Sequence, residues 1–207
     1  MFNLPNILTL SRLLLAVLFT WAMVMDSTPP SSEGQAVTGW FVCTSPYKAI
    51  ALWSFVIGAI TDFLDGHIAR KYNLVTNFGK LMDPLADKVL VSAAIIYLSC
   101  VGMCPFWVTI LIISREFLVT GLRQLAIEQG EVIAADAFGK WKTVFQLIFC
   151  ILCLTHIAYG GNLPPILSHL SEGALAELTR TITLWTATAL TLISAINYCW
   201  KARHLVK

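Results

Sequence analysis

The hydrophobic residues of this 207-residue chain gather into long apolar stretches, not into short alternating patterns. A helix that crosses a bilayer needs about 20 mostly apolar residues, and six stretches approach that length. Short segments rich in glycine, proline, serine or charge separate them. The predicted spans are Ile7–Met25, Tyr47–Leu64, Ala86–Met103, Pro105–Leu125, Trp141–Tyr159 and Leu178–Trp200. The pattern therefore predicts an all-α polytopic membrane protein with six transmembrane helices.

Composition agrees with this prediction and narrows the class of protein. Hydrophobic residues make up 57% of the chain and charged residues 13%, whereas a soluble domain has about 45–50% and about 25%. These values exclude an ordinary soluble domain and a disordered chain. The net charge of +2 is too balanced for a nucleic-acid binder. No composition shift marks a boundary, so we expect residues 1–207 to form a single transmembrane domain.

The lysines and arginines predict the orientation of the spans. Twelve of the 14 fall on one side of the predicted membrane, and Lys48 and Arg180 fall on the other. Connections that are rich in Lys and Arg stay in the cytoplasm. Both termini are therefore expected on the cytoplasmic side.

Four aspartates lie at the cytoplasmic ends of the second and third spans, where charge is costly and usually marks function. Asp62 and Asp65 are three residues apart, and Asp83 and Asp87 are four apart, so each pair shares one helix face. If the two helices are neighbours, the four carboxylates converge and repel one another unless a cation is present. One or two divalent cations such as Mg²⁺, Mn²⁺ or Ca²⁺ would remove that repulsion. Helix capping and salt bridges are the alternative, and they explain one pair better than they explain four acids.

Small and basic residues accompany these acids on the same faces. Gly66, Ala69 and Gly79 would let a ligand or a second helix backbone come close. Arg70 can bind a phosphate with its planar guanidinium, or it can anchor the helix at the membrane surface. These positions are compatible with a phosphate-containing ligand beside the carboxylates and, alternatively, with helix packing and membrane anchoring.

The segment from Asp62 to Asp87 fits the pattern DxxDGxxAR(x8)GxxxDxxxD at every fixed position, and it resembles the CDP-alcohol phosphotransferases. The resemblance implies a two-metal site for Mg²⁺ or Mn²⁺ with Asp62, Asp65 and Asp83 as ligands. It implies that Asp87 lies near the second metal and is the general base. It also implies that CDP-diacylglycerol passes close to Gly66, Ala69 and Gly79, with Arg70 on its phosphates. The same resemblance implies a homodimer in a bacterial-type cytoplasmic membrane, with the active site facing the cytoplasm.

Further segments resemble one branch of this family, the phosphatidylglycerophosphate synthases. They are Leu4–Arg12, Asp83–Lys88, Ser114–Phe117, Gly121–Arg123 and Gly139–Thr143. In that branch CDP-diacylglycerol donates a phosphatidyl group to sn-glycerol 3-phosphate, and the products are phosphatidylglycerophosphate and CMP. Asn6 and Thr9 would either cap the first helix or contact the cytidine.

Basic residues support an acceptor that carries its own phosphate. Arg115 and Arg123 are eight residues apart and lie close to one face of the fourth span, and Lys140 and Lys142 begin the fifth. Such a cationic cluster suits the phosphate of glycerol 3-phosphate. The alternative is that these residues are ordinary cytoplasmic positive charges, and for Lys142 the two interpretations are evenly balanced.

Two rival functions remain open at this point. One is another synthase of the same family that uses CDP-diacylglycerol, such as a phosphatidylinositol-phosphate or cardiolipin synthase. The other is a divalent-cation transporter, although its acids would be spread through the membrane midplane. Cys150 and Cys153 lie inside an apolar span without a second cysteine pair, so packed thiols are expected there and not a metal site. A disulfide among Cys43, Cys100 and Cys104 stays open.

Overall fold

The structure is a computed structural model that describes residues 4–26, 45–72, 77–129, 137–160 and 173–203. Within these ranges, the side chains of 4–9, 63–87, 127–128, 137–138 and 202 are left undescribed. The described chain is helical throughout and contains no strand, which confirms the predicted all-α class for this part of the protein. Its six helices are α1 (Leu4–Met25), α2 (Pro46–Tyr72), α3 (Asn77–Cys100), α4 (Phe106–Glu128), α5 (Ala137–Tyr159) and α7 (Ala174–Ala202).

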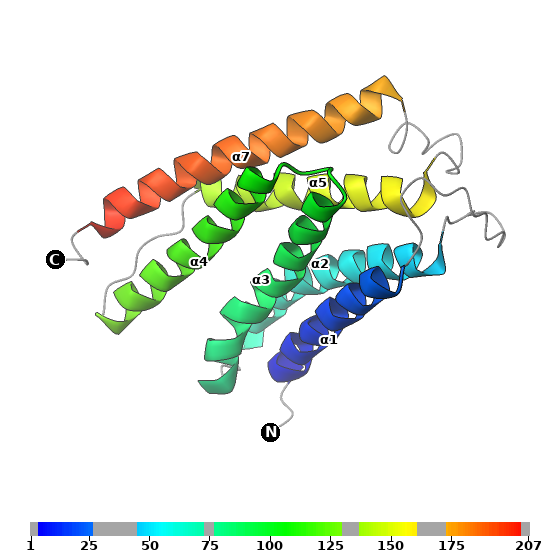
Figure 1. Cartoon of the computed structure of the whole chain (residues 1–207). Coiled ribbons are helices and arrows are strands. Elements are labelled where there is room, and N and C mark those ends of the chain that lie inside the picture. The colour runs from blue at the N-terminus through cyan, green and yellow to red at the C-terminus, as the bar shows by residue number, and fades with distance from the viewer. Residues whose placement is uncertain (1–3, 27–44, 73–76, 130–136, 161–172, 204–207) are drawn as a thin grey trace.

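The helices form a closed ring, in which α1 packs on α2 and α3, α5 packs on α2 and α7, and α4 packs on α3 and α7. Helices α3 and α5 also touch across the middle of the ring, and α2 touches α3. Figure 1 shows that the first turn of α1 and the last turn of α7 lie toward the same end of the bundle. This arrangement brings the end of α2, the start of α3, the end of α4 and the start of α5 to that end as well.

Most helices extend beyond the apolar stretches that predicted them. Helix α3 begins at Asn77, nine residues before the predicted start at Ala86, and α2 continues to Tyr72 instead of ending at Leu64. The added turns are polar, so a prediction based on an apolar window misses them. Because of these turns, Asp65 and Asp83 lie in the same continuous helices as Asp62 and Asp87.

One span ends earlier than predicted, at Cys100 instead of Met103. Gly102 adopts φ +79°, and the Met103 N–H donates to the Leu98 carbonyl at 2.9 Å. The Gly102 N–H donates to the Ser99 carbonyl at 3.1 Å. Together these bonds form a Schellman cap, which uses glycine because other residues resist a positive φ. The cap turns the chain directly into α4.

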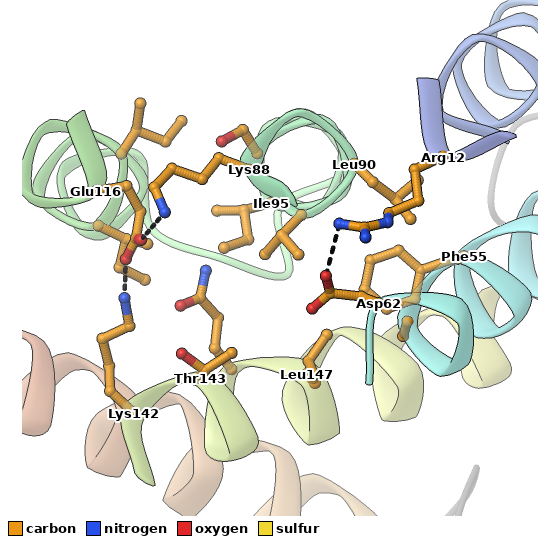
Figure 2. A pocket seen from close by; sticks show the side chains of 17 residues that line it. Arg12, Phe55, Asp62, Lys88, Leu90, Ile95, Glu116, Lys142, Thr143 and Leu147 are labelled. Atoms are coloured by element: carbon orange, nitrogen blue, oxygen red, sulfur yellow. Dashed lines mark hydrogen bonds and ion pairs between the residues drawn. The ribbon is translucent and has the colours of Figure 1, made fainter. Parts of the chain in front are cut away.

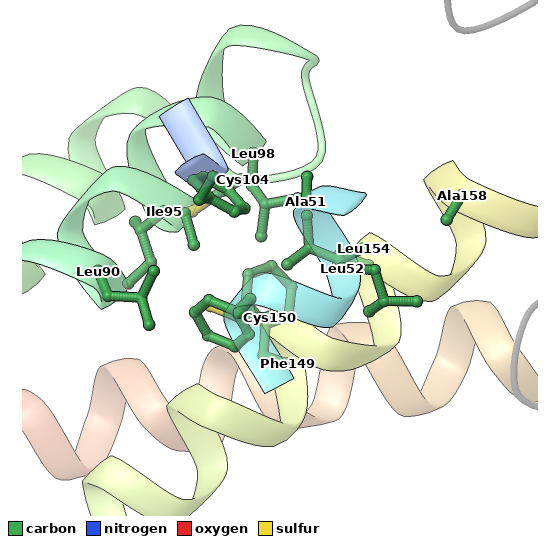
Figure 3. Packing of buried hydrophobic residues seen from close by; sticks show 14 of the residues in the cluster. Ala51, Leu52, Leu90, Ile95, Leu98, Cys104, Phe149, Cys150, Leu154 and Ala158 are labelled. Atoms are coloured by element: carbon green, nitrogen blue, oxygen red, sulfur yellow. The ribbon is translucent and has the colours of Figure 1, made fainter. Parts of the chain in front are cut away.

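The core of the bundle is built from mid-sized apolar side chains, small residues and thiols (Figure 3). Phe19 and Phe55 are almost fully buried, and their ring centroids lie 6.2 Å apart. Cys150 and Cys153 are completely buried in this core, which confirms that they are packed thiols. Such a core fixes how α1, α2, α3 and α5 pack and therefore fixes the ends that carry the polar residues.

The described cysteines Cys100, Cys104, Cys150, Cys153 and Cys199 are free thiols. Cys43 lies outside the described residues, so no pairing with it is assigned. Cys104 lies in the turn between α3 and α4, and its sulfur accepts a hydrogen bond from Thr109 Oγ1 at 3.4 Å. Burial raises the pKa of the Cys104 thiol above its ordinary value.

The outer surface of the bundle is strongly apolar. Each helix exposes large hydrophobic side chains, including Val17, Ile60, Ile96, Phe106, Val144 and Ile196. A soluble monomer rarely exposes so much apolar surface, whereas lipid tails would cover it favourably. Within the described part of the chain, residues 139–159 and 174–201 form helices long and apolar enough to cross a membrane. Six spans and cytoplasmic termini stay predictions.

Candidate active site

The signature acids lie on two neighbouring helices at one end of the bundle. Asp62, Asp65, Gly66, Ala69 and Arg70 lie in the last turns of α2. Gly79, Asp83 and Asp87 lie in the first turns of α3. Since both segments are helical, the spacings of three and four residues place each acid pair on one face. The structure thus supplies the helical register and the helix contact that the prediction assumed.

Only some of the predicted site residues have described side chains. Those outside the description are Asn6, Thr9, Asp65, Gly66, Ala69, Arg70, Gly79, Asp83 and Asp87. Their predicted roles stay predictions. The described ones are Asp62, Arg115, Arg123, Lys140 and Lys142.

Asp62 forms an ion pair with a residue that sequence reasoning assigned to the cytoplasmic charge bias. Arg12 Nη1 on α1 donates to Asp62 Oδ1 at 2.7 Å. The Arg12 side chain is 9% exposed and the Asp62 side chain is 43% exposed. The arginine is therefore fixed inside the helix packing, and it holds a carboxylate that stays open to its surroundings. Figure 2 shows this pair at one end of a pocket.

That pocket, which we call the inner cavity, has a volume of about 90 Å³. Its polar lining includes Arg12, Asp62, Lys88, Glu116 and Gln146. Apolar side chains such as Phe55, Leu90 and Ile95 line the rest. The inner cavity thus connects a carboxylate of the signature motif with a second group of charged residues.

The second group is centred on Glu116 of α4, a partly buried acid to which the sequence analysis gave no role in the site. The Glu116 carboxylate forms an ion pair with Lys142 of α5, and it lies 3.7 Å from Lys88 Nζ of α3. Arg115 Nη1 lies 3.4 Å from Glu116 Oε1. Figure 2 shows Lys88, Glu116 and Lys142 together at the end of the pocket opposite the Arg12–Asp62 pair. Among the described side chains, one acid thus contacts three cations here.

A further cavity of about 260 Å³ adjoins this group, and we call it the cationic cavity. It is lined by all four residues predicted to bind the acceptor phosphate, namely Arg115, Arg123, Lys140 and Lys142. Lys88 and Glu116 also line it. The structure therefore brings the predicted cationic residues together around one space large enough for a small anion.

Helix α7 completes the cationic cavity with two residues that the sequence analysis missed. Arg115 Nη2 donates to Ser194 Oγ at 2.5 Å, and Arg123 Nε donates to Tyr198 Oη at 3.4 Å. Ser194 and Tyr198 are four residues apart, so they lie on one face of α7. Two hydroxyl-bearing residues at that spacing in an apolar helix were the signal in the sequence that could have identified them. The two hydroxyls orient guanidinium groups that start from another helix.

The two cavities share a wall. Lys88, Glu116, Lys142 and Thr143 line both of them. An anion in the cationic cavity would therefore lie next to the inner cavity, and the inner cavity leads to Asp62. This layout suits a reaction between an anionic molecule and a second substrate held at the carboxylates.

The donor set suits a hard divalent cation. Aspartate oxygens are the ligands that Mg²⁺ and Mn²⁺ prefer, and the helical register puts the acids on one face of each of two touching helices. Among the described side chains there is no cluster of three or more potential metal ligands. The structure describes the side chain of one of the four acids, Asp62, and it lines the inner cavity.

Comparison with known proteins adds a family assignment. The sequence profile described as CDP-alcohol phosphatidyltransferase matches residues 2–193. A relative from Bacillus subtilis is 43% identical over 100% of this chain and 98% of that protein. Relatives from Rickettsia bellii (35%, over 95% of this chain and 93% of that protein) and Haemophilus influenzae (34%, over 98% and 94%) are also similar. All three are named CDP-diacylglycerol–glycerol-3-phosphate 3-phosphatidyltransferase.

Proposed function

The chain belongs to the CDP-alcohol phosphatidyltransferase family, and from this premise we propose that it transfers the phosphatidyl group of CDP-diacylglycerol to sn-glycerol 3-phosphate. The products are phosphatidylglycerophosphate and CMP. The names of the similar proteins support both substrates. The observation that carries the choice of acceptor is the cationic cavity, which gathers Arg115, Arg123, Lys140 and Lys142 around one space.

Helices α2 and α3, which carry the four aspartates and which we call the carboxylate helices, are proposed to hold the lipid donor. Members of this family generally depend on a divalent metal, and we assign the metal ligands to Asp62, Asp65, Asp83 and Asp87. Two Mg²⁺ or Mn²⁺ ions bound there would stabilise negative charge on the diphosphate and on the departing CMP. Gly66, Ala69 and Gly79 leave room for the CDP group beside the helix backbone, and Arg70 contacts its phosphates. Asn6 and Thr9 are assigned to the cytidine end of the same substrate.

The chemistry then needs one base and one nucleophile. Asp87 takes the proton from the terminal hydroxyl of glycerol 3-phosphate. The hydroxyl oxygen forms a bond to the phosphorus that carries the diacylglycerol. The bond from that phosphorus to the bridging oxygen breaks, and CMP leaves with the electron pair. Asp87 is the residue directly before Lys88, and Lys88 lines both cavities. The base is therefore adjacent in sequence to a residue of the wall between the two substrates.

The cationic cavity is proposed to hold the acceptor phosphate. Guanidinium groups bind phosphate oxygens in pairs, and ammonium groups add charge without fixing direction. Ser194 and Tyr198 orient Arg115 and Arg123, while Glu116 holds Lys142 in the wall. A preorganised cluster loses little side-chain entropy when the anion binds. An acceptor without a phosphate would make no charge-assisted contact with these cations.

The cellular setting follows from the family and from the surface of the bundle. The family is membrane-associated, and two described helices could cross a membrane by length and composition. We propose six spans in a bacterial-type cytoplasmic membrane, with both termini and the active site on the cytoplasmic side. Glycerol 3-phosphate and CMP are then exchanged with the cytoplasm. A homodimer is a further proposal and rests on the family resemblance.

Acceptor competition tests this function. Purified protein would be given CDP-diacylglycerol with glycerol 3-phosphate, glycerol, inositol 1-phosphate, serine or phosphatidylglycerol, and CMP release and the lipid product would be measured. We expect CMP release with glycerol 3-phosphate and a product of the mass of phosphatidylglycerophosphate. Turnover with inositol 1-phosphate or phosphatidylglycerol in place of glycerol 3-phosphate would assign the chain to another branch of the family. The membership of a transferase family replaces the earlier alternative of a cation transporter.

A further inference from the structure

Gln146 is a buried amide in the wall of the inner cavity. It is 4% exposed and lies on α5, in a segment whose neighbours Phe145 and Leu147 are apolar. Burying an amide away from water costs free energy unless it finds a hydrogen-bond partner. None of the hydrogen bonds that the structure gives between described residues uses this amide. Since it lines a cavity, its partner can be a molecule that occupies that cavity.

The position of Gln146 follows from the two cavities. Lys142 and Thr143 line both cavities, whereas Gln146 lines the inner cavity and not the cationic cavity. Gln146 comes four residues after Lys142, which is about 6 Å further along the same helix face. Figure 2 shows Lys142, Thr143 and Leu147 following α5 from the Glu116 group toward Asp62. Gln146 therefore lies between the proposed phosphate site and the carboxylate helices.

We propose that Gln146 hydrogen-bonds the middle hydroxyl of glycerol 3-phosphate and thereby selects this acceptor. The inference rests on the proposed function, because it assumes that the phosphate binds beside Lys142. The acceptor's three-carbon backbone then runs past Gln146, and its terminal hydroxyl reaches toward the acids of α2 and α3. A carboxamide both donates and accepts, so it matches a hydroxyl in either orientation. A site built to bond a hydroxyl discriminates against an analogue that lacks it.

The test compares two acceptors that differ by that one hydroxyl. CMP release would be measured with glycerol 3-phosphate and with 3-hydroxypropyl phosphate, for the wild-type protein and for Gln146→Leu. We expect the wild type to prefer glycerol 3-phosphate in kcat/KM. Gln146→Leu should lower kcat/KM for glycerol 3-phosphate about tenfold, the size expected for an unpaired hydroxyl in a buried site. It should change kcat/KM for 3-hydroxypropyl phosphate about twofold or less, so the preference is lost.

Gln124→Leu is the matched control, because Gln124 is exposed on α4 and lines neither cavity. Gln146→Met carries the same comparison if the leucine variant does not accumulate in membranes. Equal losses with both acceptors in the Gln146 variants would overturn the inference and assign Gln146 to helix packing. Equal efficiency of the two acceptors in the wild type would overturn it without any variant. Failure of the wild type to use glycerol 3-phosphate would instead overturn the proposed function. The measurements on the wild-type protein alone give that result, so it is distinguishable from a failure of the role of Gln146.

Discussion

The carboxylate helices and the cationic cavity adjoin the same inner cavity but use opposite charges. The acids of α2 and α3 lie within residues 62–87, whereas the cationic cavity is lined by residues from Lys88 to Tyr198 on four helices. Both proposed substrates are anions. One would be held through divalent cations on acids, and the other directly by arginine and lysine. Two anions can thus lie side by side without competing for the same groups, because one is held through divalent cations and the other by arginine and lysine side chains.

Removing the divalent cation should have the largest effect, because it disables one region entirely. With excess chelator, CMP release should fall to the level of a control without enzyme, since four carboxylates alone repel a diphosphate. Adding Mg²⁺ or Mn²⁺ back should restore it. Binding of glycerol 3-phosphate, measured by calorimetry, should persist in the chelator. Full activity in chelator would contradict a metal role for the carboxylate helices.

Within the carboxylate region, we expect Asp83 and Asp87 to differ. Asp87→Asn should lower kcat about 10²–10⁴-fold, the range for loss of a general base, while it keeps more of the affinity for CDP-diacylglycerol than Asp83→Asn does. Asp83→Asn should weaken both metal and lipid binding. Steady-state kinetics with titrated Mg²⁺ would separate the two variants. Near-normal turnover of Asp87→Asn would mean that another group is the base.

Glu116→Gln should affect the cationic cavity and leave the carboxylate helices unaffected. The variant keeps the shape of the side chain but removes the charge that holds Lys142, Lys88 and Arg115. Charged hydrogen bonds of this kind are worth about 1.5–3 kcal/mol, so the KM for glycerol 3-phosphate should rise about tenfold and the Tm should fall. Glu177→Gln on the exposed surface of α7 is the control. An unchanged acceptor KM would show that the cations do not need Glu116 to stay in place.

The smallest effect is expected at Gly139, at the edge of the cationic cavity. A Cβ placed there would lie 3.5 Å from Ser194 Oγ and 3.7 Å from Arg115 Nη2, which is ordinary contact. Gly139→Ala should therefore change the acceptor KM about twofold or less, as surface substitutions usually do. Gly139→Leu should raise it more, because the longer side chain enters the cavity. Equal kinetics for the two variants would place the bound anion elsewhere.

The sequence predicts the parts of this molecule that depend on local spacing. The apolar stretches predict the helices, and the fixed positions between Asp62 and Asp87 predict the acids on shared faces. The gathering of Arg115, Arg123, Lys140 and Lys142 was also predictable, because the two arginines lie close to one face of the fourth span and the two lysines begin the fifth. The helix ends were less predictable, since polar turns continue a helix without any apolar signal.

Side-chain partners from distant segments were not predictable. Arg12 and Asp62 are 50 residues apart, and Arg115 and Ser194 are 79 apart. Only the packing of α1 on α2, and of α4 on α7, brings them together. Sequence reasoning counted Arg12 among the cytoplasmic charges and in the segment Leu4–Arg12 that carries the resemblance, but it could not name its partner because that partner depends on the packing. Glu116 lies in the segment Ser114–Phe117 that carries the resemblance, but it was given no role for the same reason, although an acid inside an apolar helix calls for a partner.

Kinetics of Arg123→Ala with each substrate varied in turn test the division between the two regions most directly. Arg123 lines the cationic cavity, and Lys201, which lines neither cavity, supplies the control Lys201→Ala. Loss of a charged contact to a bound anion is worth about 1.5–3 kcal/mol, so the KM for glycerol 3-phosphate should rise about tenfold or more. The KM for CDP-diacylglycerol should stay close to that of the wild type and of Lys201→Ala. Equal increases for both substrates would contradict the account, because the cations would then bind the diphosphate or merely anchor the helices.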